Sequence, residues 1–173
     1  MAPLLGLGLL GVVSIWFPQV LGNGKDVSQL AFTNQVTPML LVMLLLLKPA
    51  ATVLCIRSGA PGGLFTPSLT VGALLGAVLG HAWSWLWPGV PPGLFAVLGA
   101  GAVLAVTTQG PISTVVLMME LTGRYRSFIL PLLLVVGIAT LIARTIEPRS
   151  IYDARLTDEE VETRQKLREA TSQ

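Results

Sequence analysis

The stretch Gly59-Ala60-Pro61-Gly62-Gly63-Leu64-Phe65-Thr66-Pro67 lies between two long apolar segments and decides how the chain folds. Proline is tolerated in the first helical turn, where its missing N–H would have no partner, and glycines allow a tight turn just before it. The sequence therefore predicts a helix that begins near Leu64. Because the first turn of a helix leaves amides unpaired at the positive end of the helix dipole, this start would attract anions.

The apolar surroundings of this helix start give it a possible function. Unsatisfied N–H groups in hydrocarbon are costly, so protein, water or a ligand must meet them. Leu64 and Phe65 carry no charge, so a bound anion would be held by backbone dipoles, which favours quick release. Transporters use broken helices in this way. The alternative is a Gly/Pro-rich loop that merely connects two spans, and the stretch alone does not decide between them.

Composition identifies the chain as an integral membrane protein. It has 173 residues, 53% of them hydrophobic and 12% charged, and its mean hydropathy is +0.74. Its net charge of +2 gives no indication of nucleic-acid binding. A single histidine, His81, and a single cysteine, Cys55, offer neither a metal site nor a catalytic constellation. We therefore expect no enzyme activity, no catalytic residues, no cofactor and no metal.

Apolar segments divide the chain into membrane helices. We expect spans or long apolar helices over residues 3–21, 39–56, 66–87 and 128–146, and a short helix over 27–33. Half-length helices over 93–107 and 112–121, separated by Gln109-Gly110-Pro111, are typical of a discontinuous membrane segment. Gly72, Gly76 and Gly80 recur every four residues and predict close helix packing.

Two ionisable residues stand out in these apolar segments. Lys48, followed by Pro49, predicts either two short helices or one bent helix. An ion-pathway role for Lys48 is open, because intramembrane charges are costly, but we favour a side chain that snorkels toward the membrane surface. We interpret Glu120 as a helix-end carboxylate near Arg124 or Arg126 rather than as a proton carrier.

Several motifs together resemble the CLC family of chloride channels and proton-coupled chloride transporters. Gly62-Gly63-Leu64-Phe65-Thr66-Pro67 resembles the family's GxFxP anion-binding motif. Further matches, in the family's order, are Gln19-Val20-Leu21-Gly22-Asn23-Gly24, Gly99-Ala100-Gly101-Ala102, Gly110-Pro111, Met119-Glu120-Leu121-Thr122-Gly123, and Tyr152 after the last span. The resemblance covers essentially the whole chain.

The resemblance implies a chloride site built from Gly63, Leu64, Phe65 and Tyr152. The N–H groups of Leu64 and Phe65 would face the ion, and the Tyr152 hydroxyl would donate to it. Such neutral donors bind an anion without trapping it. The resemblance also implies a multi-pass protein of the cell membrane and a homodimer in which each subunit holds its own pore. The ions carried would be chloride and, in the transporters, protons.

The match corresponds to the second half of the family's membrane domain. We therefore expect an all-α, polytopic fold of short and broken helices over residues 1–156, the second inverted-repeat half, followed by a charged cytoplasmic tail over 157–173. The gating and proton-accepting glutamates belong to the other half, so channel and antiporter are not separated. The expected function is chloride transport as part of a CLC-type voltage-gated channel or H+/Cl− antiporter. The alternative is a non-conducting fragment that only packs or dimerises with family members.

Overall fold

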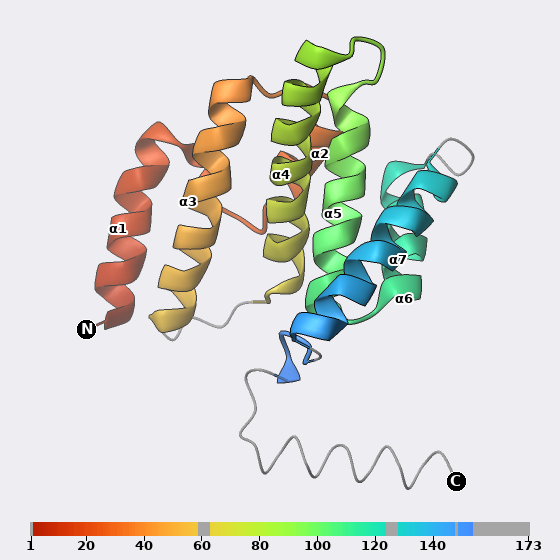
Figure 1. Ribbon diagram of the computed structural model, residues 1–173. Helices are drawn as coiled ribbons and strands as arrows, with labels where there is room; N and C mark the ends of the chain where they lie inside the picture. Colours follow the sequence, from red (N-terminus) through yellow and green to blue (C-terminus); the bar gives the residue numbers. More distant parts are fainter. Residues whose placement is uncertain (1, 59–62, 124–127, 148, 154–173) are drawn as a thin grey trace, which may run out of the picture.

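A computed structural model describes residues 2–58, 63–123, 128–147 and 149–153, and within these ranges all regular structure is helical (Figure 1). The elements are α1 (Ala2–Trp16), the 3-10 helix η1 (Pro18–Val20), α2 (Lys25–Phe32), α3 (Pro38–Arg57), α4 (Phe65–Leu86), α5 (Pro92–Thr108), α6 (Pro111–Thr122) and α7 (Ile129–Ile146). The all-α class is therefore confirmed. The predicted tail over 157–173 lies outside the described residues.

Within the described ranges, α3, α4 and α7 are long and apolar enough to cross a membrane. This finding confirms a multi-pass membrane protein. The predicted discontinuous segment is also confirmed, because α5 ends at Thr108, Gln109 adopts a left-handed conformation with φ of 55°, and α6 begins at Pro111. Proline at the first helical position has no N–H that needs an acceptor, so a new helix can start there without losing a hydrogen bond.

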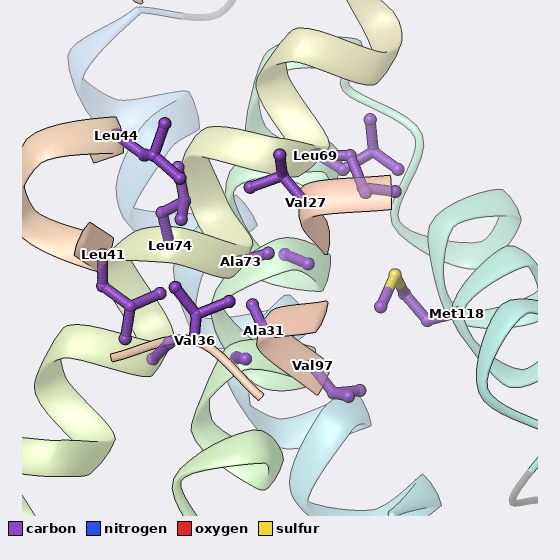
Figure 2. Close-up of a cluster of buried hydrophobic side chains, with 14 of the residues drawn as sticks. Val27, Ala31, Val36, Leu41, Leu44, Leu69, Ala73, Leu74, Val97 and Met118 are labelled. Atoms are coloured by element: carbon purple, nitrogen blue, oxygen red, sulfur yellow. The ribbon is translucent and has the colours of Figure 1, made fainter. Parts of the chain in front are cut away.

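The helices lie in a row, with α1 and α3 at one side, α4 and α5 in the centre, and α6 and α7 at the other side (Figure 1). The short helix α2 packs against α4 and α5. Figure 2 shows part of the buried core, to which each of the helices α1 to α7 contributes side chains. These include Val27 and Ala31 of α2, Leu41 and Leu44 of α3, Leu69, Ala73 and Leu74 of α4, Val97 of α5 and Met118 of α6.

The glycines of α4 pack directly against the backbone of α5, as their spacing predicts. A Cβ added to Gly72 would lie 2.5 Å from the carbonyl oxygen of Gly99, and one added to Gly76 would overlap the carbonyl oxygen of Phe95. Small residues at this spacing let two helix backbones approach closely. This contact fixes the position of α4 against α5 in the middle of the row.

The first predicted span is wrong at its C-terminal end. Helix α1 ends at Trp16 instead of continuing to Leu21, because Phe17 is non-helical, with φ of −129° and ψ of 73°, and Pro18 begins η1. The residue before a proline is disfavoured in the helical region. With 15 residues, α1 is about 22 Å long, which is shorter than a usual span.

The favoured interpretation of Lys48 is also wrong. Helix α3 continues through Pro49 as one helix, which is one of the two predicted alternatives, but the Lys48 side chain is only 3% exposed. Its ammonium donates to backbone carbonyls inside the protein instead of reaching the surface. The apolar pattern alone could not show this, because the acceptors come from a distant part of the chain.

Candidate anion-binding site at the start of α4

Helix α4 begins where the sequence predicts, with Leu64 as N-cap and Phe65 as its first residue. The first main-chain bond of the helix joins the Ser68 N–H to the Leu64 carbonyl at 3.0 Å, and no side chain caps this end. Pro67 has no N–H. Within the described residues, the amides of Leu64, Phe65 and Thr66 therefore have no acceptor, as expected for an uncapped first turn.

This start differs from those of α3, α5 and α6, each of which begins with proline. Those helices present no N–H at their first position, whereas α4 presents one on Phe65. The residues around it are uncharged: Gly63 is exposed, Leu64 half-buried and Phe65 40% exposed. Among the described residues, no atom lies within 4 Å of the position that a Cβ on Gly63 would take. The first turn of α4 is therefore a cluster of neutral donors.

A cavity of about 370 Å³ lies beside this first turn. Gly63 and Pro67 line it at the start of α4, and its other lining residues include Val20, Leu21, Gly22 and Lys48. Leu64, Phe65 and Tyr152 are not among its lining residues. The cavity thus borders the predicted chloride site without enclosing all of it.

The segment that carries Tyr152 is fixed to the end of α5. The Ile151 N–H donates to the Thr107 carbonyl at 2.9 Å, and the Ser150 hydroxyl both accepts from the Asp153 N–H at 3.1 Å and donates to the Asp153 carboxylate at 2.7 Å. This pair resembles a capping box. Residues 149–153 and the start of α4 lie at the same end of the row of helices (Figure 1).

Tyr152 itself is 42% exposed, and its hydroxyl has no hydrogen-bond partner among the described residues. The phenol is therefore available as a donor. The described contacts do not join it to Leu64 or Phe65, so its share in an ion site stays a prediction.

Replacing Ser150 by alanine is expected to loosen this segment by about 1 kcal/mol, the usual cost of losing a capping side chain. Hydrogen exchange of the Ile151 amide, which reports its bond to Thr107, should become roughly fivefold faster. Thr145→Ala removes an exposed hydroxyl that bonds within its own helix, and it serves as the control. Equal exchange in both variants would contradict a fixing role for Ser150.

Charged groups near this end of the bundle pair with one another. Glu147 accepts from the side chain of Arg149 at 3.2 Å, and the Arg149 main-chain N–H, followed by its side chain, holds the pKa of Glu147 below its usual value. Such an exposed pair contributes little stability. Arg144 donates to the Gln109 side chain at 3.3 Å, beside the end of α5.

Other residues singled out in the sequence lie elsewhere. Glu120 is exposed on α6, and its expected partners Arg124 and Arg126 lie outside the described residues, so that pairing stays a prediction. Sequence reasoning missed Ser150 and Asp153, although the pattern Ser-x-x-Asp is a known signal of a helix start.

Comparisons with known proteins agree on one family. A sequence profile described as "Voltage gated chloride channel" matches residues 1–144. The H(+)/Cl(−) exchange transporter ClcA of Cronobacter sakazakii is 34% identical over 152 residues, an alignment that covers 86% of this chain and 32% of that protein. ClcA of Salmonella paratyphi A is 34% identical over 151 residues, with the same two coverages.

Among solved structures, this fold matches the crystal structure of a slow cyanobacterial Cl−/H+ antiporter. The TM-score is 0.66 and the sequence identity 29%, and the match covers 73% of this chain and 30% of that one. The chain therefore spans about a third of the length of the proteins that it matches.

Proposed function

Because this chain belongs to the voltage gated chloride channel family, we propose that it forms part of a chloride-transport pathway in which the first turn of α4 binds the ion. The family consists of chloride channels and H+/Cl− exchangers, not of enzymes. The observation that carries the proposal is that the amides of Leu64 and Phe65 have no acceptor among the described residues, at the N-terminus of a helix long enough to span a membrane.

The proposed ligands are the N–H groups of Leu64 and Phe65, with Gly63 leaving room for the ion beside them. A hydrogen bond to a charged group contributes about 1.5–3 kcal/mol, and the helix dipole adds to it. No lysine or arginine is needed at this position. A site of this kind is strong enough for an anion to enter and weak enough for it to leave, as conduction requires.

We propose the Tyr152 hydroxyl as a further donor to the same ion. Two observations support this role: residues 149–153 lie at the same end of the helix row as the start of α4, and the Tyr152 hydroxyl has no partner among the described residues. The bond between Ile151 and Thr107 would hold the phenol in a constant place relative to α5.

Tyr152→Phe removes this hydroxyl and leaves the ring, so chloride affinity should fall by about tenfold. Titration of the purified protein with chloride by isothermal calorimetry measures the change. Phe65→Ala removes a ring but keeps the backbone N–H, and it should change the affinity much less. An unchanged affinity in Tyr152→Phe would exclude the phenol from the site.

The family description names a channel and the relatives' names an H+/Cl− exchanger, so the proposal has two mechanisms, chloride movement without or with exchange for protons. We also propose that the protein forms a homodimer. The outer faces of α6 and α7 expose Ile112, Leu130 and Leu141 to between 68% and 81%, which suits a second subunit or lipid.

A second candidate is a non-conducting fragment that only packs or dimerises with family members. The observation that favours it is the coverage, because the chain spans 32% of the length of its relatives and supplies one helix end to the proposed site.

Chloride efflux from liposomes tests both candidates. One preparation contains the protein purified from its native membrane, and the other contains the 173-residue chain alone. Selective efflux from the first preparation supports chloride transport, and its absence contradicts that function. Selective efflux from the chain alone would refute the fragment candidate.

A further inference from the structure

Lys48 is a buried cation held by backbone carbonyls. It lies within α3, in a window of mean hydropathy 2.4, and its side chain is 3% exposed. Its ammonium donates to the carbonyl oxygens of Val20 at 2.8 Å, Gly22 at 3.0 Å and Leu21 at 3.4 Å. An ammonium has three donors, so these acceptors saturate it.

No carboxylate neutralises this charge in the part of the chain that the structure describes, where Glu147 with Arg149 makes the one ion pair. A buried charge without a counter-charge is costly, and the dipoles of the three carbonyls compensate it here. The acceptors come from the end of η1 and the residues after it, where carbonyls lack helical partners. Lys48 and residues 20–22 therefore satisfy one another.

The segment held by Lys48 is also bound to α4. The Gly24 carbonyl accepts from the Thr70 hydroxyl at 3.1 Å, and the Thr70 hydroxyl in turn accepts from the Ser28 hydroxyl at 3.1 Å. Space at Gly24 is filled, because an added Cβ would collide with the Thr70 hydroxyl and lie 3.0 Å from Cε of Lys48. Residues 20–24 thus bridge α3 and α4.

Thr70 continues this bridge to the first turn of α4. Its hydroxyl lies 2.9 Å from the carbonyl oxygen of Thr66, the residue after Phe65. Thr70 is fully buried, so water does not compete for its bond to Gly24. A displacement of residues 20–24 would therefore be transmitted to the amides at the start of α4.

The bonds to Lys48 also affect the cavity beside the first turn of α4. Its wall includes Val20, Leu21 and Gly22 together with Gly63 and Pro67. Carbonyl oxygens directed into this space would repel an anion, but those of residues 20–22 point to the ammonium of Lys48.

We propose that Lys48 is a positioning residue for the anion site. It holds residues 20–24 in place and, through Gly24 and Thr70, keeps the first turn of α4 where its amides are open to the ion. Lys48 does not contact the ion. This inference rests on the proposed function for its effect on chloride, whereas the link from Lys48 to α4 exists without any ligand.

Three variants test the inference in the protein purified from its native membrane. Lys48→Met keeps the length of the side chain and removes the ammonium, Lys48→Arg restores a cation, and Thr70→Val removes the hydroxyl that joins Gly24 to α4. The half-saturating chloride concentration of efflux should rise about tenfold in Lys48→Met and about threefold in Thr70→Val, and it should stay near the original value in Lys48→Arg. The maximal rate should change less than the half-saturating concentration.

Hydrogen exchange measured without chloride tests the link from Lys48 to α4 independently of ion binding. The amides of Ser68 to Thr70 should exchange faster in Lys48→Met and Thr70→Val and at the original rate in Lys48→Arg. Chloride efflux could be absent from the unmodified protein while hydrogen exchange changes in the variants as expected. The proposed function would then be wrong, and the link from Lys48 to α4 would be supported. Unchanged exchange and unchanged chloride dependence in Thr70→Val overturn the inference even if Lys48→Met does not fold. A Lys48→Arg variant as impaired as Lys48→Met also overturns it.

Discussion

Replacing Gly76 by alanine is expected to lower the free energy of unfolding by about 3 kcal/mol, the upper end of the range for overpacking. The added Cβ would overlap the carbonyl oxygen of Phe95 and lie 2.7 Å from its carbonyl carbon and 3.0 Å from Cα of Ala96. These are backbone atoms, so no flexible side chain can move aside. Helices α4 and α5 would have to separate. Thermal unfolding followed by tryptophan fluorescence measures the loss, since Trp83 of α4 lies with its ring 6.3 Å from that of Phe95.

Gly137→Ala is the matched control for this prediction. Gly137 also lies inside a membrane helix, α7, but an added Cβ there meets nothing within 4 Å. Alanine has the higher helix propensity, so this variant should be as stable as the unmodified protein or slightly more stable. If the two variants unfold at the same temperature, the contact between α4 and α5 is not as tight as the structure describes.

Much of the fold could be predicted because the residues that start and end its helices act locally. The starts of α4, α5 and α6 each follow from glycine or proline, whose backbone limits act within one or two residues. Close packing of α4 on another helix could also be predicted, since the period of four places Gly72, Gly76 and Gly80 on one face, whereas the partner α5 is seen only in the structure. These features need no knowledge of the rest of the molecule.

The role of Lys48 could not be predicted in the same way. A lysine in an apolar run is compatible with snorkelling, with an ion pathway and with a buried cap. The position of Val20 and Gly22 decides between these roles, and both residues lie more than twenty residues away in the chain. The same holds for Thr70, whose partners are Gly24 and Ser28. Long-range polar contacts leave no periodic pattern in a sequence.

The site residues were predicted partly from the physical chemistry of a helix start and partly from the resemblance to the family. Free amides at Leu64 and Phe65 follow from the start of a helix after glycines. Tyr152 carries no such signal, because an isolated tyrosine after a span is equally typical of a membrane surface. Its placement depends on the bond from Ile151 to Thr107, which only the folded chain reveals.

Replacing the peptide bond between Leu64 and Phe65 by an ester is expected to weaken chloride binding by about 10- to 100-fold, the value of one hydrogen bond to a charged group. The substitution exchanges the Phe65 N–H for an oxygen and leaves every side chain in place. It therefore removes one of the proposed ligands without changing a side chain. Chloride titration of the purified protein by isothermal calorimetry gives the affinity, and circular dichroism checks that the helices are retained.

An ester between Phe128 and Ile129 is the matched control, because α7 begins in the same way as α4. Its N-cap Phe128 has φ of −115° and ψ of −9°, close to the −91° and −12° of Leu64, and each helix has proline as its third residue. Each ester also weakens one carbonyl that accepts the first helical bond, from Ser68 in α4 and from Leu132 in α7. Helix α7 starts at the opposite end of the row (Figure 1), so its ester should leave chloride affinity unchanged. Equal losses in both variants would mean that weakened helix starts, and not a lost ligand, reduce the binding.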